Sequence, residues 1–309
     1  HCHSIIQRIV VPLNVKLIPM GKRLLYLIVT WMVTISILSC QQRENVQRTI
    51  SVTILPQKFL AEQIAGDKFN VNCVVPANGN PEAYDPSPQQ LAAVENSEAY
   101  LRVGMLGFEI AWMDKLSHNN PEMKIFDTSQ GIDMIKSTHS HTHHDGVSHA
   151  MSVVDPHIWC SPKNARVMAR NIYNALEEID STNREYYKAR YERLVQRIDS
   201  VDSVMTQMLL PCEGTTFAIY HPSLSYFARD YNLQQLCIEN MGKETSAFAM
   251  KSVVEQARDK EVEVVFVQSE FNPRQVYTFA QEIDARPIEI NPLSYDWINE
   301  MLSISYATA

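Results

Sequence analysis

The stretch REYYKARYERLVQRIDSVDSVMTQMLL, residues 184–210, combines apolar and charged residues in a regular pattern within a 309-residue chain. Its apolar side chains recur at intervals of three and four, the spacing that gathers them on one face of an α-helix. They are Tyr187, Tyr191, Leu194, Ile198, Val201, Met205 and Met208. About 27 residues at 1.5 Å each give a helix about 40 Å long, the length of a small domain. The pattern therefore predicts one long amphipathic helix.

This helix belongs to a longer helical segment, residues 162–210, with a break expected near Asp180–Asn183. Flexible linkers between domains are usually rich in glycine, serine or proline, and this segment is not. We interpret it as a rigid connection between two lobes. The alternative is an ordinary packed helix inside a single domain.

Short apolar stretches alternate with helical stretches on both sides of this connection. The expected strands before it are Thr49–Leu55, Val71–Val75, Tyr100–Val103 and Lys124–Phe126. Those after it are Thr216–Tyr220, Gln235–Ile238, Val262–Val267 and Ile288–Ile290. Strands that alternate with helices form parallel sheets. The predicted fold class is α/β, with two small doubly wound parallel-sheet lobes, residues 49–161 and 211–309, joined by a long rigid helix.

The composition is that of a globular protein that does not bind nucleic acid. Hydrophobic residues make up 45% of the chain, and 27 basic against 35 acidic residues give a net charge of −8. Without a strongly basic surface there is little to attract a polyphosphate backbone. We therefore expect no nucleic-acid partner.

The N-terminal residues are expected to be an export signal rather than part of a lobe. Residues 1–19 precede the first methionine and are interpreted as an upstream, non-native extension. Residues 20–40 have a basic start, an apolar run and a small residue before Cys40, which resembles a bacterial lipoprotein signal peptide with Cys40 as the lipidated residue. Residues 41–48 would be the tether. The alternative is a membrane helix, but the apolar run is shorter than the roughly 20 residues that a span needs.

Export to an oxidising compartment makes the remaining cysteines relevant. Apart from Cys2 and Cys40 they are Cys73, Cys160, Cys212 and Cys237. Four cysteines allow three complete disulfide pairings, and the sequence does not choose among them. Free buried thiols are a further alternative.

The stretch STHSHTHHDGVSH, residues 137–149, holds five of the ten histidines. They are His139, His141, His143, His144 and His149. Such tracts are typical of metal binding, and a solvated loop without a function is the alternative. Five imidazoles on a flexible loop lose ordering entropy when they bind an ion, so we expect auxiliary, low-affinity binding there.

Three further side chains lie just beyond expected strands or beyond the His-rich loop. They are Glu82, His157 and His221. Each alone is explained by a solvated carboxylate or by a histidine that satisfies backbone groups. Because ligands gather at the carboxyl ends of parallel strands, the three together predict a divalent transition-metal site with nitrogen and oxygen donors from both lobes.

Five motifs make the chain similar to a known family. They are NPEAYDPSPQQL, DPHIWCSPKNA, AIYHPSLSYFARDYNL, ENMGKETSA and VFVQSEFNP. Their order resembles that of the TroA/ZnuA-like lipoproteins, the metal-binding receptors of ABC importers, over residues 48–306. The resemblance implies two lobes joined by a rigid helix, a zinc or manganese ion captured between them, and delivery to a membrane permease.

The resemblance also implies a set of metal ligands. The first is usually a histidine in a PHxYEPTP loop, and here that position is Glu82. The second falls on His157 and the third on His221.

The fourth ligand, when present, follows the last strand of the second lobe. The aspartate of many relatives is replaced there by Asn291, so Asp296 is nominated, with Glu270 as the competing candidate. Asp296 could instead cap the final helix, which is expected to begin around Trp297.

Zinc is the expected ion for two reasons: the chain has a His-rich loop, and most sites with nitrogen and oxygen donors bind zinc more tightly than manganese. The carboxylate of Glu82 makes manganese or iron more acceptable. The chain lacks H-E-x-x-H and G-x-x-x-x-G-K-[ST] motifs, so we expect a binding protein rather than an enzyme. A zinc metalloenzyme and a metal-buffering adhesion lipoprotein are the alternatives.

The expected protein is an exported, membrane-anchored monomer, periplasmic or at the cell surface, whose partner is an ABC permease.

Overall fold

The computed structural model describes residues 48–309, apart from residues 78, 137–153 and 240–246. The chain divides into two units, residues 1–46 and residues 47–309, and all elements described below belong to the second. The predicted extension, signal peptide, lipidation site Cys40 and most of the tether lie outside the described residues. The five histidines of the His-rich loop do so as well.

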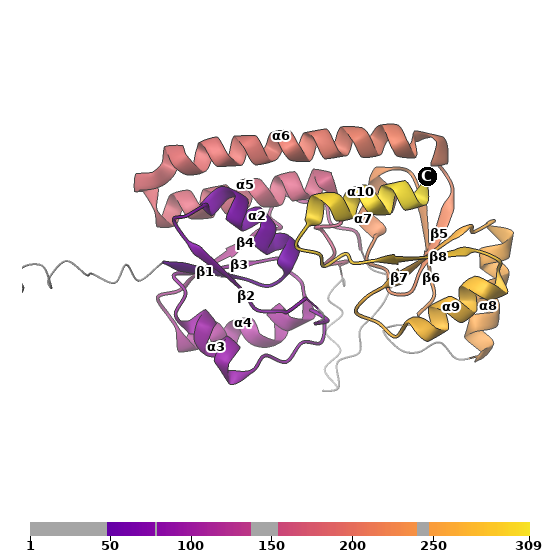
Figure 1. Cartoon of the computed structure of the whole chain (residues 1–309). Helices are drawn as coiled ribbons and strands as arrows, with labels where there is room; N and C mark the ends of the chain where they lie inside the picture. Colours follow the sequence, from indigo (N-terminus) through magenta and orange to yellow (C-terminus); the bar gives the residue numbers. More distant parts are fainter. Residues whose placement is uncertain (1–47, 78, 137–153, 240–246) are drawn as a thin grey trace, which may run out of the picture. The chain divides into compact units, whose positions relative to one another are not determined.

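The first sheet has four parallel strands in the order β2-β1-β3-β4 (Figure 1). The strands are β1 (Thr49–Val52), β2 (Asn70–Cys73), β3 (Ala99–Arg102) and β4 (Lys124–Asp127). The helices between them are α2 (Leu55–Ala65), α3 (Pro88–Glu95) and α4 (Gly107–Asn119). In the register of this sheet, Ile50 pairs with Val71 on one side and with Ala99 on the other.

The second sheet repeats this arrangement with the strand order β6-β5-β7-β8. Its strands are β5 (Thr216–Ile219), β6 (Gln234–Cys237), β7 (Val264–Gln268) and β8 (Arg286–Ile290). Its helices are α7 (Ser225–Asp230), α8 (Ala247–Asp259), α9 (Pro273–Glu282) and α10 (Trp297–Thr308). All pairings are parallel, which confirms the predicted α/β fold with two parallel-sheet lobes.

The connection between the sheets breaks where the sequence predicted. Helix α5 (Pro162–Ile179) ends before the single turn η3 (Ser181–Asn183), and the 26-residue helix α6 (Arg184–Leu209) follows, closed by the turn η4 (Leu210–Cys212). Helix α5 packs along α6, so the segment folds back on itself and α6 alone makes the long connection (Figure 1). Helix α6 also contacts α2 from the first lobe and α10 from the second.

The buried face of α6 follows the predicted pattern except at two positions: Tyr191 is only partly buried, and the last buried residue differs. Leu209 is buried in place of Met208, because the step of four from Met205 reaches Leu209. Local signals act as expected elsewhere: Gly66 ends α2 with a φ of 59°, and Ser87 and Gln90 form a capping box at the start of α3. Strand β1 is shorter than predicted, because Pro56 starts α2 in its first turn.

The largest apolar core extends through both lobes. It joins side chains of β1 and β3 to side chains of β5 and β7 through α2, α5, α6 and α10. Two tryptophans connect it across the lobes: the indole of Trp297 donates to the carbonyl of Trp159 at 2.7 Å, and the indole of Trp159 donates to the carbonyl of Pro292 at 2.9 Å. Smaller cores lie between the first sheet and α3 and α4, and between the second sheet and α8 and α9. The two lobes therefore share much of their buried interior.

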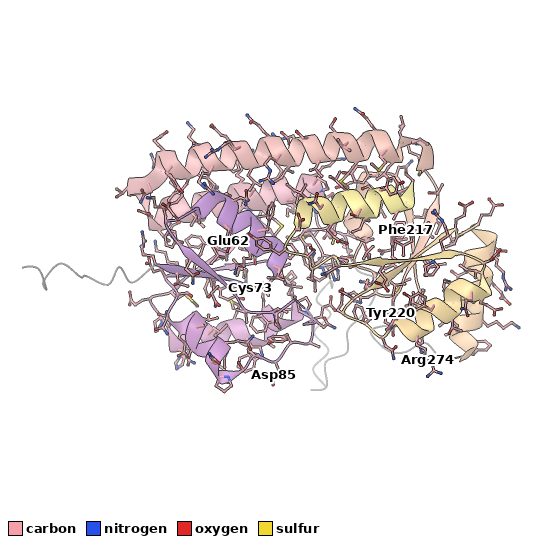
Figure 2. All side chains as sticks on the ribbon, viewed as in Figure 1. Glu62, Cys73, Asp85, Phe217, Tyr220 and Arg274 are labelled. Carbon is pink, nitrogen blue, oxygen red and sulfur yellow. The ribbon has the colours of Figure 1, made fainter. Side chains whose placement is uncertain are left out.

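The four cysteines for which the sequence allows disulfide pairing, Cys73, Cys160, Cys212 and Cys237, are all free thiols. Cys73 lies at the end of β2 in the first lobe (Figure 2), and Cys237 lies at the equivalent end of β6. Burial raises the pKa of each of these two thiols to about 12. Within the described residues, no helix is both long and apolar enough to cross a membrane.

Candidate metal centre

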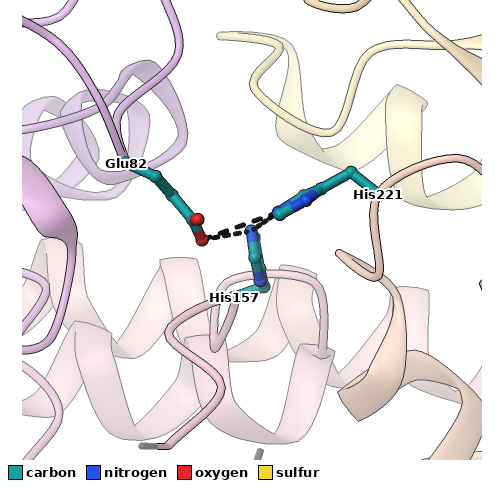
Figure 3. A group of neighbouring side chains, drawn as sticks. All are labelled: Glu82, His157 and His221. Atoms are coloured by element: carbon teal, nitrogen blue, oxygen red, sulfur yellow. Dashed lines mark hydrogen bonds and ion pairs between the residues drawn. The ribbon is translucent and has the colours of Figure 1, made fainter. Parts of the chain in front are cut away.

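Three side chains from separate loops converge on one point: Glu82, His157 and His221 (Figure 3). The Nε2 atoms of the two histidines are 3.2 Å apart, and each lies 3.5 Å from Oε1 of Glu82. Two ligands bound at 2.0–2.1 Å to a tetrahedral zinc ion lie about 3.3 Å from each other. The three donor atoms therefore have the mutual spacing of three corners of a tetrahedral metal site.

The parallel sheets bring these loops together. Glu82 lies in the loop between β2 and α3, and His221 comes two residues after β5. His157 precedes α5, so it stands at the entrance to the connection between the lobes. Glu82 and His221 thus lie in loops that follow strands, which is where open α/β sheets bind ligands.

Each histidine is oriented by a carboxylate on its other ring nitrogen. Nδ1 of His157 lies 2.8 Å from Oδ1 of Asp155, which also accepts the backbone N–H of His157 at 2.9 Å. Nδ1 of His221 lies 2.9 Å from Oε1 of Glu239. When Nδ1 donates to a carboxylate, the lone pair of a neutral imidazole is on Nε2, and the ring is fixed in orientation. Both Nε2 atoms thus face Glu82 as potential metal donors.

The site is shielded from solvent and negatively charged. His157 is 5% exposed and His221 is 7% exposed. Burial opposes protonation of His221, but its hydrogen bonds and charge interactions with Glu239 and Glu82 are stronger and raise its pKa to about 10. For Asp155, burial acts to raise the pKa, and the nearby His157 outweighs it and lowers the pKa. This surplus of carboxylates favours a cation.

The backbone around His221 is held by Gln268, the last residue of β7. Its side-chain oxygen accepts the backbone N–H of His221 at 2.8 Å, and its side-chain nitrogen donates to the hydroxyl of Ser223 at 3.0 Å. Gln268 is almost fully buried. The third predicted ligand is therefore fixed by the neighbouring strand of its own sheet.

The two candidates for a fourth ligand differ in their surroundings. Glu270 lines a small cavity together with His157 and His221, and burial raises its pKa. Asp296 is exposed, and its carboxylate accepts a hydrogen bond from the side-chain amide of Asn299 at 2.7 Å. Asp296 is the residue before α10, but its side chain makes no capping hydrogen bond there. Glu270, and not Asp296, therefore lines the cavity beside the two histidines, while the close group of donor atoms consists of Glu82, His157 and His221.

Comparison with known proteins identifies the family. The sequence model of the ZnuA family, described as "Zinc-uptake complex component A periplasmic", matches residues 50–303. The chain belongs to the ZnuA family. A crystal structure of a ZnuA deletion mutant plus zinc bound is 35% identical, with a TM-score of 0.76, over 84% of this chain and 95% of that one.

Two further relatives show the range of metals named in and around the ZnuA family. The high-affinity zinc uptake system protein ZnuA of Bacillus subtilis is 25% identical over 79% of this chain and 78% of its own length. The manganese ABC transporter substrate-binding lipoprotein PsaA of Streptococcus mitis is 25% identical over 72% of each chain. These relatives are transport proteins, which confirms the prediction of a non-enzymatic protein and does not favour the metalloenzyme alternative.

Sequence reasoning missed the groups that orient the ligands in this ZnuA family member. Asp155 and Glu239 each begin one of the family motifs, DPHIWCSPKNA and ENMGKETSA, and nothing in these motifs marks this role. The one available signal was position: Glu239 follows β6 just as His221 follows β5, so the two meet at one sheet edge. Gln268 gave no signal, because it ends an otherwise apolar strand.

Proposed function

We propose that this protein is the extracytoplasmic metal receptor of an ABC importer, and that it captures one divalent transition-metal ion and delivers it to a membrane permease. The observation that carries the proposal is the spacing of the donor atoms of Glu82, His157 and His221, each supplied by a different loop. The carboxylates of Asp155 and Glu239, which fix both imidazoles, support it.

We propose zinc as the ion and Glu270 as the fourth ligand. Two imidazole ligands suit zinc, and sites of this kind generally bind zinc more tightly than manganese. Glu270 is supported by its place beside His157 and His221. A second carboxylate in the shell would also admit manganese or iron, and one relative is named for manganese.

Ion capture would displace a proton. The pKa of His221, raised to about 10, means that its ring is protonated at neutral pH in the metal-free protein. A metal ion needs the unprotonated Nε2 atom, so binding would release this proton. Both Glu82 and Glu239 stabilise the protonated ring of His221. After the proton leaves, Glu82 would face the bound ion, and Glu239 would face Nδ1 of the neutral ring.

Release would require only that loops from the two lobes separate. Ligands on different loops can move apart without unfolding either sheet, and a permease that prefers the opened form would shift the population towards it. The shared apolar core around α6 supports local loop movement over a large rotation of the lobes.

The remaining parts of the proposal concern residues outside the described structure. Cys40 would carry the lipid anchor of an exported monomer, periplasmic or at the cell surface. His139, His141, His143, His144 and His149 would collect ions with low affinity near the site.

Titration calorimetry of the mature protein with Zn²⁺ tests the proposal. We expect one tightly bound ion, and we expect His157→Ala and His221→Ala each to weaken it more than about 100-fold, beyond the 10–100-fold typical of outer-shell partners. His118→Ala removes an exposed imidazole from α4 and serves as the matched control. Tight zinc binding that survives in both site variants would refute the proposal.

A further inference from the structure

The first turn of α4 lies directly against the backbone of Glu82. A Cβ atom on Gly107 would come within 2.0 Å of the carbonyl oxygen of Glu82 and within 2.9 Å of its carbonyl carbon. The next residue, Phe108, donates its backbone N–H to the carbonyl of Pro81 at 3.0 Å. Helix α4 therefore touches the loop at the proposed ligand itself and at the residue before it.

This first turn is itself anchored to the sheet by Glu109. The carboxylate of Glu109 accepts the backbone N–H groups of Val103 and Gly104, both at 2.7 Å, and the hydroxyl of Thr53. Glu109 is 1% exposed. Because Thr53 follows β1 and Val103 follows β3, one buried carboxylate ties the start of α4 to the ends of two central strands.

The close approach, and not backbone conformation, is what requires glycine at position 107. Gly107 is the first residue of α4 and does not have a positive φ, so alanine suits its backbone. Real Cβ atoms essentially never lie within 3.0 Å of a heavy atom outside their own residue and its chain neighbours, so a methyl group would push the Glu82 backbone away by about 1 Å. Metal–ligand distances tolerate only about 0.2 Å.

We propose that Gly107 is a positioning residue for metal binding: it seats the backbone of Glu82 so that the carboxylate reaches the point on which the two imidazoles converge, and Glu109 holds Gly107 in place. This inference rests on the proposed function. It gives α4, which carries none of the proposed ligands, a direct part in setting the geometry of the site.

The first test is the affinity of Gly107→Ala for Zn²⁺, measured by calorimetry on the mature protein. We expect a loss of 10–100-fold, the range for groups that orient a ligand. Ala111→Ser adds one heavy atom at an exposed position of the same helix and should bind zinc like the unaltered protein. Unchanged affinity in Gly107→Ala would overturn the inference.

A double-mutant cycle separates positioning from a general structural effect. If Gly107→Ala acts through Glu82, it should cause no further loss of zinc affinity in a Glu82→Ala background. An equal loss in both backgrounds, or a metal-free Gly107→Ala protein that no longer unfolds cooperatively, would mean that the contact serves the fold and would overturn the inference. Failure of the proposed function is distinct, because it would appear in His157→Ala and His221→Ala with Gly107 intact.

Discussion

His157 and His221 use their two ring nitrogens for different purposes. In each, Nδ1 meets a carboxylate and Nε2 points to the common centre, so the ring orientation is set before any ion arrives. Glu82 stands where the family resemblance leads one to expect a histidine. Its Oε1 atom lies 3.5 Å from each Nε2 atom, close to the 3.2 Å between the two Nε2 atoms. Both the nature of the donors and their preorganisation thus favour a small divalent cation.

Glu109 offers a test at the residue scale. Burial raises the pKa of Glu109 to about 7, although hydrogen bonds from Thr53 and from the backbone of Gly104 and Val103 act to lower it. Because this pKa exceeds the ordinary value of 4.5, its protonation contributes stability that is full below pH 4.5 and is lost as the pH rises to about 7. Glu109→Gln cannot ionise, so its unfolding free energy should not fall in this way. The difference in unfolding free energy between Glu109→Gln and the unaltered protein should therefore shift by about 3 kcal/mol in favour of the variant as the pH rises over that range.

Urea unfolding of the two metal-free proteins at pH 4.5 and pH 8 measures this difference. Glu122→Gln, at an exposed position after α4, is the control for removing a carboxylate. A Glu109→Gln difference that is the same at both pH values would contradict a raised pKa for Glu109.

At the scale of elements, the loops carry the proposed chemistry and the helices fix their ends. The His-rich loop is an example, because its two ends are held together by an antiparallel bridge between Lys136 and Val154. The backbone N–H of Asp155 also donates to the carbonyl of Ile135 at 2.9 Å. These contacts keep the segment that orients His157 in place from outside the loop.

We therefore expect deletion of Thr138–His149 to leave the tightest zinc site intact. Five residues, Ser137 and Ala150–Val153, remain to join the bridged ends, while His157 and Asp155 keep their contacts. Calorimetry should show the same tight affinity and the loss of weaker ions only. A variant with the five loop histidines changed to serine is the control for loop length. Loss of the tight site in both variants would show that the loop supplies a ligand.

At the scale of the molecule, the shared core makes the two lobes one cooperative unit. The largest core passes from one sheet to the other through α5, α6 and α10, and Trp159 and Trp297 lie fully buried within it. Lobes with separate cores could unfold independently, whereas a core that both lobes build must be lost as a whole.

We expect calorimetric unfolding of the metal-free protein to show a single transition, and Zn²⁺ to shift it upwards without splitting it. At a free concentration 100 times Kd, binding to the folded state alone adds about 2.7 kcal/mol. His221→Ala should show the same single transition with little or no shift. Two resolved transitions in the metal-free protein would contradict the shared core.

Much of this protein is determined by local sequence patterns. The spacing of apolar residues predicts α6, its break near Asp180 and most of the strands, because helix and strand periodicity depend on near neighbours. Glu82, His157 and His221 follow expected strands or the His-rich loop, and these positions are sufficient to predict that the three residues form one metal site. The structure adds their distances.

Only the tertiary structure decided the rest. The return of α5 along α6, the core shared by both lobes, and the presence of Glu270 rather than Asp296 beside the histidines depend on packing between residues far apart in the chain. The same holds for Glu239 against His221 and for Gly107 against Glu82. The periodicity of a sequence shows which face of a helix or strand is buried, but not which distant element packs against that face. Contacts between distant elements place Glu239 beside His221 and Gly107 against the backbone of Glu82.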